Sequence, residues 1–234
     1  METNIISKLR RRIIDVAYRD GMGHIPSALS ILDIVWTLYD KVMTKDDQFI
    51  LSKGHGVMAL YAVLEEKGLL DWSKRLMGHP KRGDANGAIL ASTGSLGHGL
   101  PIAIGLAMAK KIKGETGRVF CLIGDGECNE GTTWECALLA AHHELNNLVV
   151  IVDWNSSSER ALSVGSLRAK FLAFDWFANV INYYEQFGIG GGIIKPLAII
   201  AKTIKGNGVP FMQAPEWHNK KLSEQDYKNA LSIP

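Results

Sequence analysis

Two continuous apolar runs, each ended by a short polar group, most constrain what this chain can fold into. Residues 119–123 are followed by Gly124-Asp125-Gly126, and residues 148–152 are followed by Asp153-Trp154-Asn155. Short runs that are apolar at every position are typical of strands covered on both faces of a parallel sheet. A helical pattern at 131–143 lies between them and completes a βαβ unit. The sequence therefore predicts a doubly wound α/β fold, with a mostly parallel sheet flanked by helices.

The same patterns predict the remaining elements of a single domain over residues 1–234. Apolar runs indicate further strands at 48–51 and 197–201 and a weaker one at 176–181. Helical spacing of apolar residues indicates helices at 5–19, 29–43, 57–67 and 98–113, with Ser27 as a cap for the second. The glycine-rich residues 187–195 leave little chain for a crossover before the last strand.

Asp125 and Asn155 are 30 residues apart, which is one strand-to-strand repeat of a βαβ unit. Their side chains are therefore expected at the carboxyl edge of neighbouring strands, where open α/β sheets bind ligands. A carboxylate, an amide oxygen and a backbone carbonyl beyond Asn155 suit a magnesium ion that also binds a diphosphate. Gly126 allows the backbone to approach the phosphates. The alternative is that Asp-Gly forms only a turn and Asn155 only a turn or cap.

Four of the seven histidines directly follow a glycine: His24, His55, His79 and His98. All four lie in predicted turns, where side chains line clefts more often than cores. Imidazole both donates and accepts protons near neutral pH, so such a cluster suits the handling of hydroxyl and phosphate groups. Each Gly-His pair taken alone could be only a helix terminus.

Composition excludes several classes of function. The formal net charge is +2, which gives no electrostatic argument for binding nucleic acid or a membrane. The basic run 8–12 lies among Ile5, Ile6, Ile13 and Ile14 and is interpreted as a solvated helix face. No apolar stretch is long enough to span a bilayer. The three cysteines match no metal or redox spacing, so buried thiols and a cytoplasmic location are expected.

The chain resembles the amino-terminal, diphosphate-binding half of transketolases, which are thiamine diphosphate enzymes. The motifs that carry the resemblance run in family order over nearly the whole chain: GHIPSALS (23–30), SKGH (52–55), GHP (78–80), TGSLGHG (93–99), GDGECNEGTTWE (124–135), VDWN (152–155), AKTIKGNG (201–208) and EWH (216–218). The GDG…N pair is shared by many thiamine diphosphate enzymes. The histidine set and EWH are more specific to transketolases.

The resemblance implies a role for each matching residue. Asp125, Asn155 and the backbone carbonyl of Ser157 would ligate Mg²⁺ or Ca²⁺. Gly126 and His55 would contact the diphosphate, and the backbones of Gly94 and Leu96 would contact the aminopyrimidine ring. His24, His79 and His218 would contact the sugar substrate. Glu130 would link the two active sites of a dimer. Glu130 could instead be a first-turn glutamate favoured by the helix dipole.

The implied reaction is transfer of a two-carbon ketol unit from a ketose phosphate to an aldose phosphate. The family also requires a glutamate from a pyrimidine-binding domain, which follows the segment matched here. A partner chain is therefore expected to supply the pyrimidine-binding and C-terminal domains, with two copies of each chain. Three alternatives stay open: a deoxyxylulose phosphate synthase-like enzyme, a transketolase for an unusual sugar, and a non-catalytic partner-binding subunit. The five residues after Asn155 form a shorter loop than the family usually has, which puts the third metal ligand in question.

Overall fold

The computed structural model describes residues 2–73, 78–160, 162–182 and 194–233. It divides into two compact units, which are treated separately below. The sheet unit comprises Val42–Lys53 and Thr93–Thr203, and the helical unit comprises Met1–Lys41, Gly54–Ser92 and Ile204–Pro234. In the part of the chain that is described, no helix has the combined length and apolar character that crossing a membrane requires.

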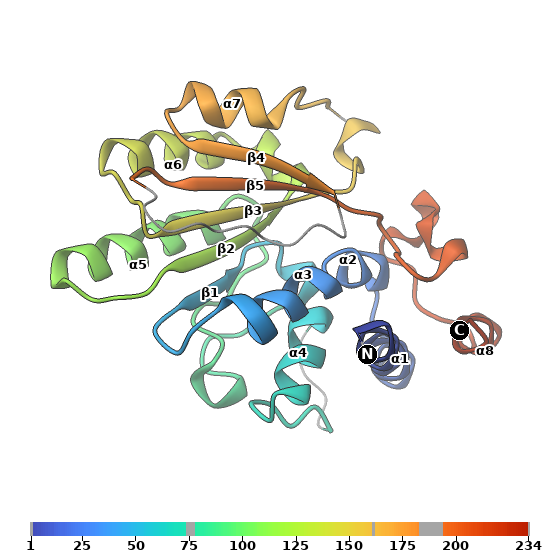
Figure 1. Ribbon diagram of the computed structural model, residues 1–234. Helices are drawn as coiled ribbons and strands as arrows, with labels where there is room; N and C mark the ends of the chain where they lie inside the picture. The colour runs from blue at the N-terminus through green and yellow to red at the C-terminus, as the bar shows by residue number, and fades with distance from the viewer. Residues whose placement is uncertain (1, 74–77, 161, 183–193, 234) are drawn as a thin grey trace. The chain divides into compact units, whose positions relative to one another are not determined.

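The sheet unit is built on five parallel strands in the order β1-β2-β3-β5-β4 (Figure 1). The strands are β1 (Gln48–Leu51), β2 (Val119–Gly124), β3 (Leu148–Trp154), β4 (Phe177–Asn182) and β5 (Leu197–Lys202). Every residue of β2 is buried, and so are the first six of β3. The prediction of a parallel α/β sheet with these strands is confirmed.

Three helices of the sheet unit pack against one another along the sheet. α5 (Gly99–Lys113) packs on β1 and β2, and α6 (Gly131–His142) packs on α5. Trp134 of α6 has its ring centroid 5.4 Å from that of Phe171 in α7 (Leu167–Ala173), which covers β4 and β5. Because the chain steps from β1 to β2 to β3 to β4 in one direction across the sheet, right-handed crossovers place these helices on the same face.

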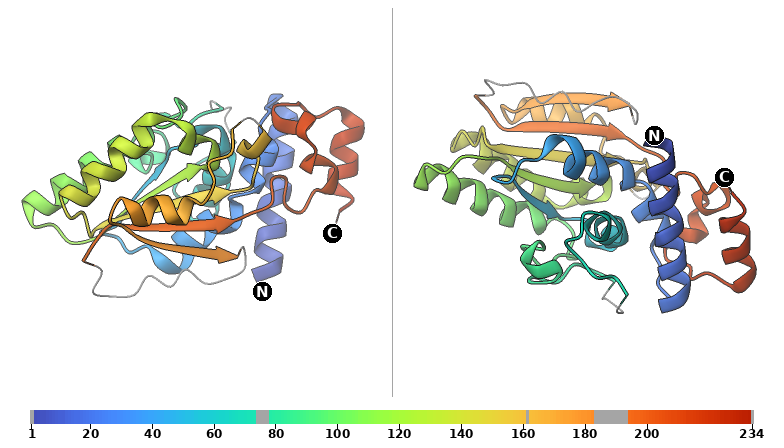
Figure 2. Two further views of the ribbon diagram at one scale, coloured as in Figure 1. Left: turned by 90° about the horizontal axis from the view of Figure 1, so that it is seen from above. Right: turned by 60° about the horizontal axis from the view of Figure 1, so that its bottom comes forward.

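The helical unit contains the two ends of the described chain side by side. α1 (Glu2–Asp20) packs on α4 (Val57–Glu66) and on α8 (Glu224–Leu231), and Figure 2 shows α8 alongside α1. Tyr18 and Tyr227 stack with ring centroids 4.3 Å apart, and the Tyr227 hydroxyl donates to Asp15 Oδ1 at 2.9 Å. These contacts bring the 204–233 segment, which carries His218, onto the amino-terminal helices.

One predicted helix and its cap are wrong. The expected helix 29–43 is divided into α2 (Ile25–Leu29), α3 (Leu32–Thr37) and a π-helical turn (Leu38–Val42). Ser27 lies buried inside α2 and is not its cap; the capping position is occupied by His24. Apolar residues cover almost every side of this segment, so helical spacing could not reveal the breaks. Most of the glycine-rich stretch 187–195 lies outside the described residues.

Candidate functional site

The carboxyl ends of β2 and β3 bring Asp125 and Asn155 to the same edge of the sheet. The register pairs Gly124 with Asp153; Asp125 directly follows Gly124, and Asn155 lies two residues after Asp153. Asp125 is only 3% exposed. Its Oδ1 accepts from the N–H of Gly126 at 2.8 Å, and its Oδ2 from the N–H of Ser158 at 3.5 Å. The loop after Asn155 therefore closes back onto Asp125, despite being short.

The amide of Asn155 is held in one orientation. Its Nδ2 donates to Asp153 Oδ2 at 2.9 Å, which fixes Oδ1 as the outward acceptor. Oδ1 accepts from the N–H of Ser157 at 3.1 Å, in a turn that passes through Ser156 at φ 61°. An amide oxygen has two lone pairs, so Oδ1 keeps a second one with which it can bind a cation.

Lys53, Asp153 and Thr203 support this site and were missed by the sequence reasoning. Lys53 and Asp153 form a buried ion pair, with side chains 2% and 0% exposed. Thr203 Oγ1 donates to the other carboxylate oxygen of Asp153. The signal was present in the sequence: a lysine lies two residues after the apolar run of β1, and an aspartate directly follows the apolar run of β3. A charged side chain that is buried at the end of a strand is costly unless an opposite charge pairs with it.

The electrostatics of Asp125 suit a bound cation. Burial raises its pKa above the ordinary value of 3.8, and the nearby charge of Asp153 raises it further. A divalent ion beside Asp125 would reverse both effects, because it stabilises the ionised form. Among the described residues, no group of three or more His, Cys, Asp or Glu side chains is arranged to hold a metal. One carboxylate, one amide oxygen and phosphate oxygens fit Mg²⁺ better than an all-protein cage does.

The loop 93–99 follows Ser92 in the sequence, leads into α5 and carries Gly94 and Leu96. Gly94 has φ +149°, and Leu96 is 38% exposed. The segment is fixed at its start by Thr93 Oγ1, which donates to the carbonyl of Leu51 at 2.5 Å. His98 is the residue before α5 and contacts its own loop, with Nδ1 2.9 Å from the carbonyl of Leu96. The backbone of Gly94 and Leu96 is thus presented from an anchored loop.

Two further residues close to Asp125 differ in exposure. Glu130 is exposed at the capping position of α6 and makes no side-chain capping bond, so its proposed linking role stays a prediction. Cys128 is buried, and burial raises the pKa of its thiol well above the ordinary range. An un-ionised thiol is a poor nucleophile, so Cys128 is assigned no role in the chemistry. All three cysteines are free and buried, as expected.

Three of the predicted histidines cluster in the helical unit. The ring centroid of His24 lies 5.3 Å from that of His55 and 5.2 Å from that of His218. The cluster depends on a close approach of backbones: a Cβ on Gly23 would lie 2.8 Å from the carbonyl oxygen of Asn219 and 2.0 Å from its Oδ1, so only glycine fits. His24 itself adopts φ 59°, a conformation rare outside glycine and frequent at functional sites. His79 is exposed in the same unit.

The contacts of His24 and His218 define complementary proton arrangements. His24 Nδ1 lies 3.0 Å from the carbonyl of His218, so it must donate, which leaves Nε2 of the neutral ring as an acceptor. His218 Nδ1 lies 2.9 Å from Lys205 Nζ, an ammonium that can only donate, so the proton of a neutral His218 is on Nε2. One ring is thereby prepared to accept a hydroxyl proton and the other to donate one.

We predict that His24 titrates below its ordinary pKa of 6.5. Burial is the first cause of the lowered pKa, followed by the charge of His218, with smaller effects of His79 and Lys205. Because the folded pKa lies below the unfolded one, this histidine costs stability as the pH falls from 6.5 through the lowered value. NMR titration should show the low pKa, and His218→Ala should move it upward. His143→Ala, an exposed control, should leave it unchanged; an unmoved pKa in His218→Ala would refute the assignment.

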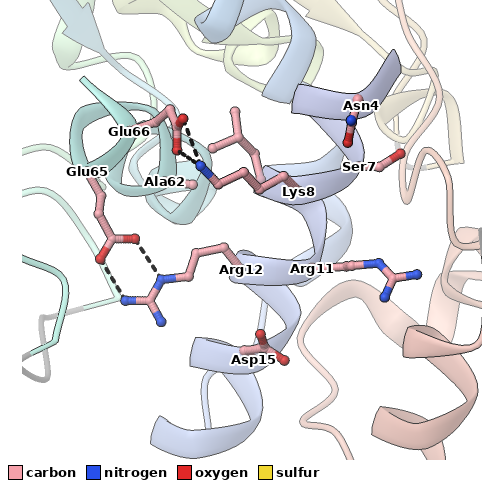
Figure 3. Close-up of a pocket in the computed structure, with 10 residues that line it drawn as sticks. Asn4, Ser7, Lys8, Arg11, Arg12, Asp15, Ala62, Glu65 and Glu66 are labelled. Carbon is pink, nitrogen blue, oxygen red and sulfur yellow. Dashed lines mark hydrogen bonds and ion pairs between the residues drawn. The ribbon is translucent and has the colours of Figure 1, made fainter. Parts of the chain in front are cut away.

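A separate hollow of about 760 Å³ lies along α1 and α4 in the helical unit (Figure 3). Three cations and three carboxylates line it, and two of the cations form ion pairs: Lys8 with Glu66 at 2.7 Å, and Arg12 with Glu65 at 2.6 Å. Because these charges balance, the hollow offers little net attraction for a diphosphate, and we do not assign the cofactor to it. The pairs agree with the interpretation of residues 8–12 as a solvated helix face.

Comparisons with known proteins agree with this geometry. Residues 1–231 match the family model described as transketolase, thiamine diphosphate binding domain. A protein of Phocaeicola vulgatus, named as one of the subunits of an apulose-4-phosphate transketolase, is 33% identical, over 96% of this chain and 90% of that protein. The 6-deoxy-6-sulfo-D-fructose transketolase subunit SqwG of a Clostridium species is 32% identical, over 99% of this chain and 94% of that protein.

The fold is also that of solved transketolases. The transketolase from Leishmania mexicana superposes with a TM-score of 0.83 at 24% identity, over 97% of this chain. This chain spans 40% of the length of that protein, whereas it spans most of the two subunits above. The resemblance found in the motifs is confirmed over almost all of the sequence: the chain belongs to the transketolase family, and it corresponds to the thiamine diphosphate-binding domain.

Proposed function

We propose that this chain is the diphosphate-binding subunit of a split transketolase, which transfers a two-carbon ketol unit from a ketose phosphate to an aldose phosphate. The observation that carries the proposal is the paired edge of β2 and β3, where Asp125 and an oriented Asn155 follow neighbouring strands. Relatives named as separate transketolase subunits, which this chain matches over most of their length, support the division into two polypeptides.

Asp125, Asn155 Oδ1 and the carbonyl of Ser157 hold Mg²⁺ in this proposal, with Gly126 and His55 on the diphosphate. Gly94 and Leu96 contact the aminopyrimidine ring through their backbones. Thiamine diphosphate supplies the carbanion that accepts the ketol unit. The partner subunit supplies the pyrimidine-binding and C-terminal domains, with the glutamate that activates the ring. Glu130 links the two active sites of an assembly that contains two copies of each chain.

The histidines move protons on the sugar. His24, with Nε2 as an acceptor, takes a proton from a substrate hydroxyl, and His218, with a proton on Nε2, donates to the developing oxyanion. His79 contributes to binding the sugar in the same unit. The location that fits three buried, free thiols is the reducing cytoplasm.

Reconstitution tests the proposal. The purified chain is mixed with a pyrimidine-binding-domain subunit, Mg²⁺, thiamine diphosphate and a panel of ketose and aldose phosphates, including branched and sulfonated sugars. Turnover is expected only with both subunits, and mass measurement of the active species should give two copies of each. Robust turnover by this chain alone would disprove the split. Cofactor binding without turnover on any donor would point to a different thiamine diphosphate reaction, and no binding at all to a non-catalytic subunit.

A further inference from the structure

Glu127 is a charged side chain near the proposed site for which neither the resemblance nor the proposed function gives a role. It lies two residues after Asp125, between β2 and α6, and is only 1% exposed. A buried carboxylate is costly unless it is fully hydrogen-bonded. The hydrogen-bond partners of Glu127 therefore indicate its role.

Both carboxylate oxygens of Glu127 accept hydrogen bonds from three separate segments of the sheet unit. Oε1 accepts from Ser52 Oγ at 2.6 Å and from the N–H of Gly97 at 3.0 Å. Oε2 accepts from the N–H of Gly124 at 2.8 Å. The side chain thus joins the residue after β1, the last residue of β2 and the loop before α5.

The loop at 93–99 depends on these bonds for its position. Ser52 Oγ, which donates to Glu127, also accepts from the N–H of Gly99 at 3.1 Å. The approach is tight, because a Cβ on Gly97 would lie 2.8 Å from Glu130 Cβ, and one on Gly99 would lie 2.5 Å from Ser52. Glu127 fixes the carboxyl-terminal end of the loop, as Thr93 fixes its start. Gly94 and Leu96 lie between the two anchors.

We infer that Glu127 is a positioning residue for ring recognition: its carboxylate holds the 93–99 loop so that the backbone of Gly94 and Leu96 is presented to the aminopyrimidine ring of the cofactor. This inference rests on the proposed cofactor. Only a carboxylate can do this, because all three groups around it donate and each of its oxygens must accept. An amide has one accepting oxygen, so in Glu127→Gln either Gly124 or Gly97 faces an NH₂ group and loses its acceptor.

The test compares two probes on the reconstituted enzyme by calorimetry. Mg²⁺ with thiamine diphosphate reports on ring and diphosphate together, and Mg²⁺ with inorganic diphosphate reports on the metal site alone. Glu127→Gln should weaken thiamine diphosphate binding by about 10-fold, the order expected when a buried donor that supports the binding loop loses its acceptor. Binding of inorganic diphosphate should change much less. Glu135→Gln, an exposed glutamate on α6, is the matched control and should change neither.

Hydrogen exchange gives a reading that does not depend on binding. The amides of Gly97 and Gly99 should exchange faster in Glu127→Gln, while those inside β3 keep their protection. If this variant does not fold, Ser52→Ala removes one donor, keeps the carboxylate and should show the same ring-selective weakening to a smaller degree. Equal weakening of both probes, or no weakening of either, overturns the inference. A wild-type enzyme that binds neither probe overturns the proposed function instead.

Discussion

Asp125→Ala should abolish metal-dependent binding of thiamine diphosphate while leaving the protein folded. Loss of an outer-shell partner weakens metal sites by about 10–100-fold, so loss of a direct ligand should cost more than about 100-fold. Asp125 is the carboxylate ligand of the proposed site, and a carboxylate contributes most of the attraction that a protein offers Mg²⁺ beside a diphosphate. Calorimetric titration of the reconstituted enzyme measures the loss directly.

The unliganded stability of the same variant separates ligand loss from unfolding. Burial raises the pKa of Asp125 above its ordinary value, so its ionised carboxylate costs folding free energy at neutral pH. Removal of the charge removes that cost, and we expect the unliganded melting temperature to stay the same or rise. The increase in melting temperature that Mg²⁺ and thiamine diphosphate give the wild type should vanish. Asp175→Ala, at an exposed aspartate of the sheet unit, should keep that increase. A retained increase in Asp125→Ala would remove Asp125 from the metal site.

The strands of this fold could be predicted closely because each is apolar at nearly every position. β2 and β3 extend only one and two residues beyond the apolar runs that indicated them. The prediction of a single helix over 29–43 was wrong for a related reason. This segment is apolar on almost all sides, so its sequence pattern does not show where one short helical piece ends and the next begins. The contact of His24 with the carbonyl of His218 spans 194 residues of sequence, so the spacing of the motifs could not show it.

The placement of Asp125 and Asn155 at one edge of the sheet could be predicted from spacing, whereas the residues that support them could not. Asp125 and Asn155 are related by one βαβ repeat, which is a property of local structure. Lys53 and Asp153 are 100 residues apart and lie at the carboxyl ends of β1 and β3, which β2 separates, so their pairing could be predicted only if the order of the strands were known. Glu127 lies inside a recognised motif, but its three donors come from segments that only the tertiary fold assembles. Charged residues at the ends of apolar runs were the one signal available.

Lys53→Met should destabilise the protein by about 3–5 kcal/mol, the range measured when one partner of a buried ion pair is removed. Both side chains of the Lys53–Asp153 pair are almost completely buried, so water cannot replace the lost ammonium. The variant Lys195→Met tests the same chemistry on the surface, because Lys195 pairs with Asp175 at side-chain exposures of 38% and 72%. Its cost should stay below about 1 kcal/mol. Urea unfolding of both variants measures the difference.

The double variant Lys53→Met, Asp153→Asn identifies the cause of the loss. If the cost of Lys53→Met comes from the charge left on Asp153, neutralising that charge should recover part of the stability, and the two effects will not add. The metal site should not recover with it. Asn155 donates its Nδ2 to Asp153 Oδ2, and an asparagine at position 153 gives that amide a weaker acceptor. Stability restored together with full Mg²⁺ and thiamine diphosphate affinity would show that the ion pair serves the fold alone. Stability restored without affinity would mean that Lys53 and Asp153 are retained, at the cost of burying two charges, because they orient the amide of Asn155 toward the metal.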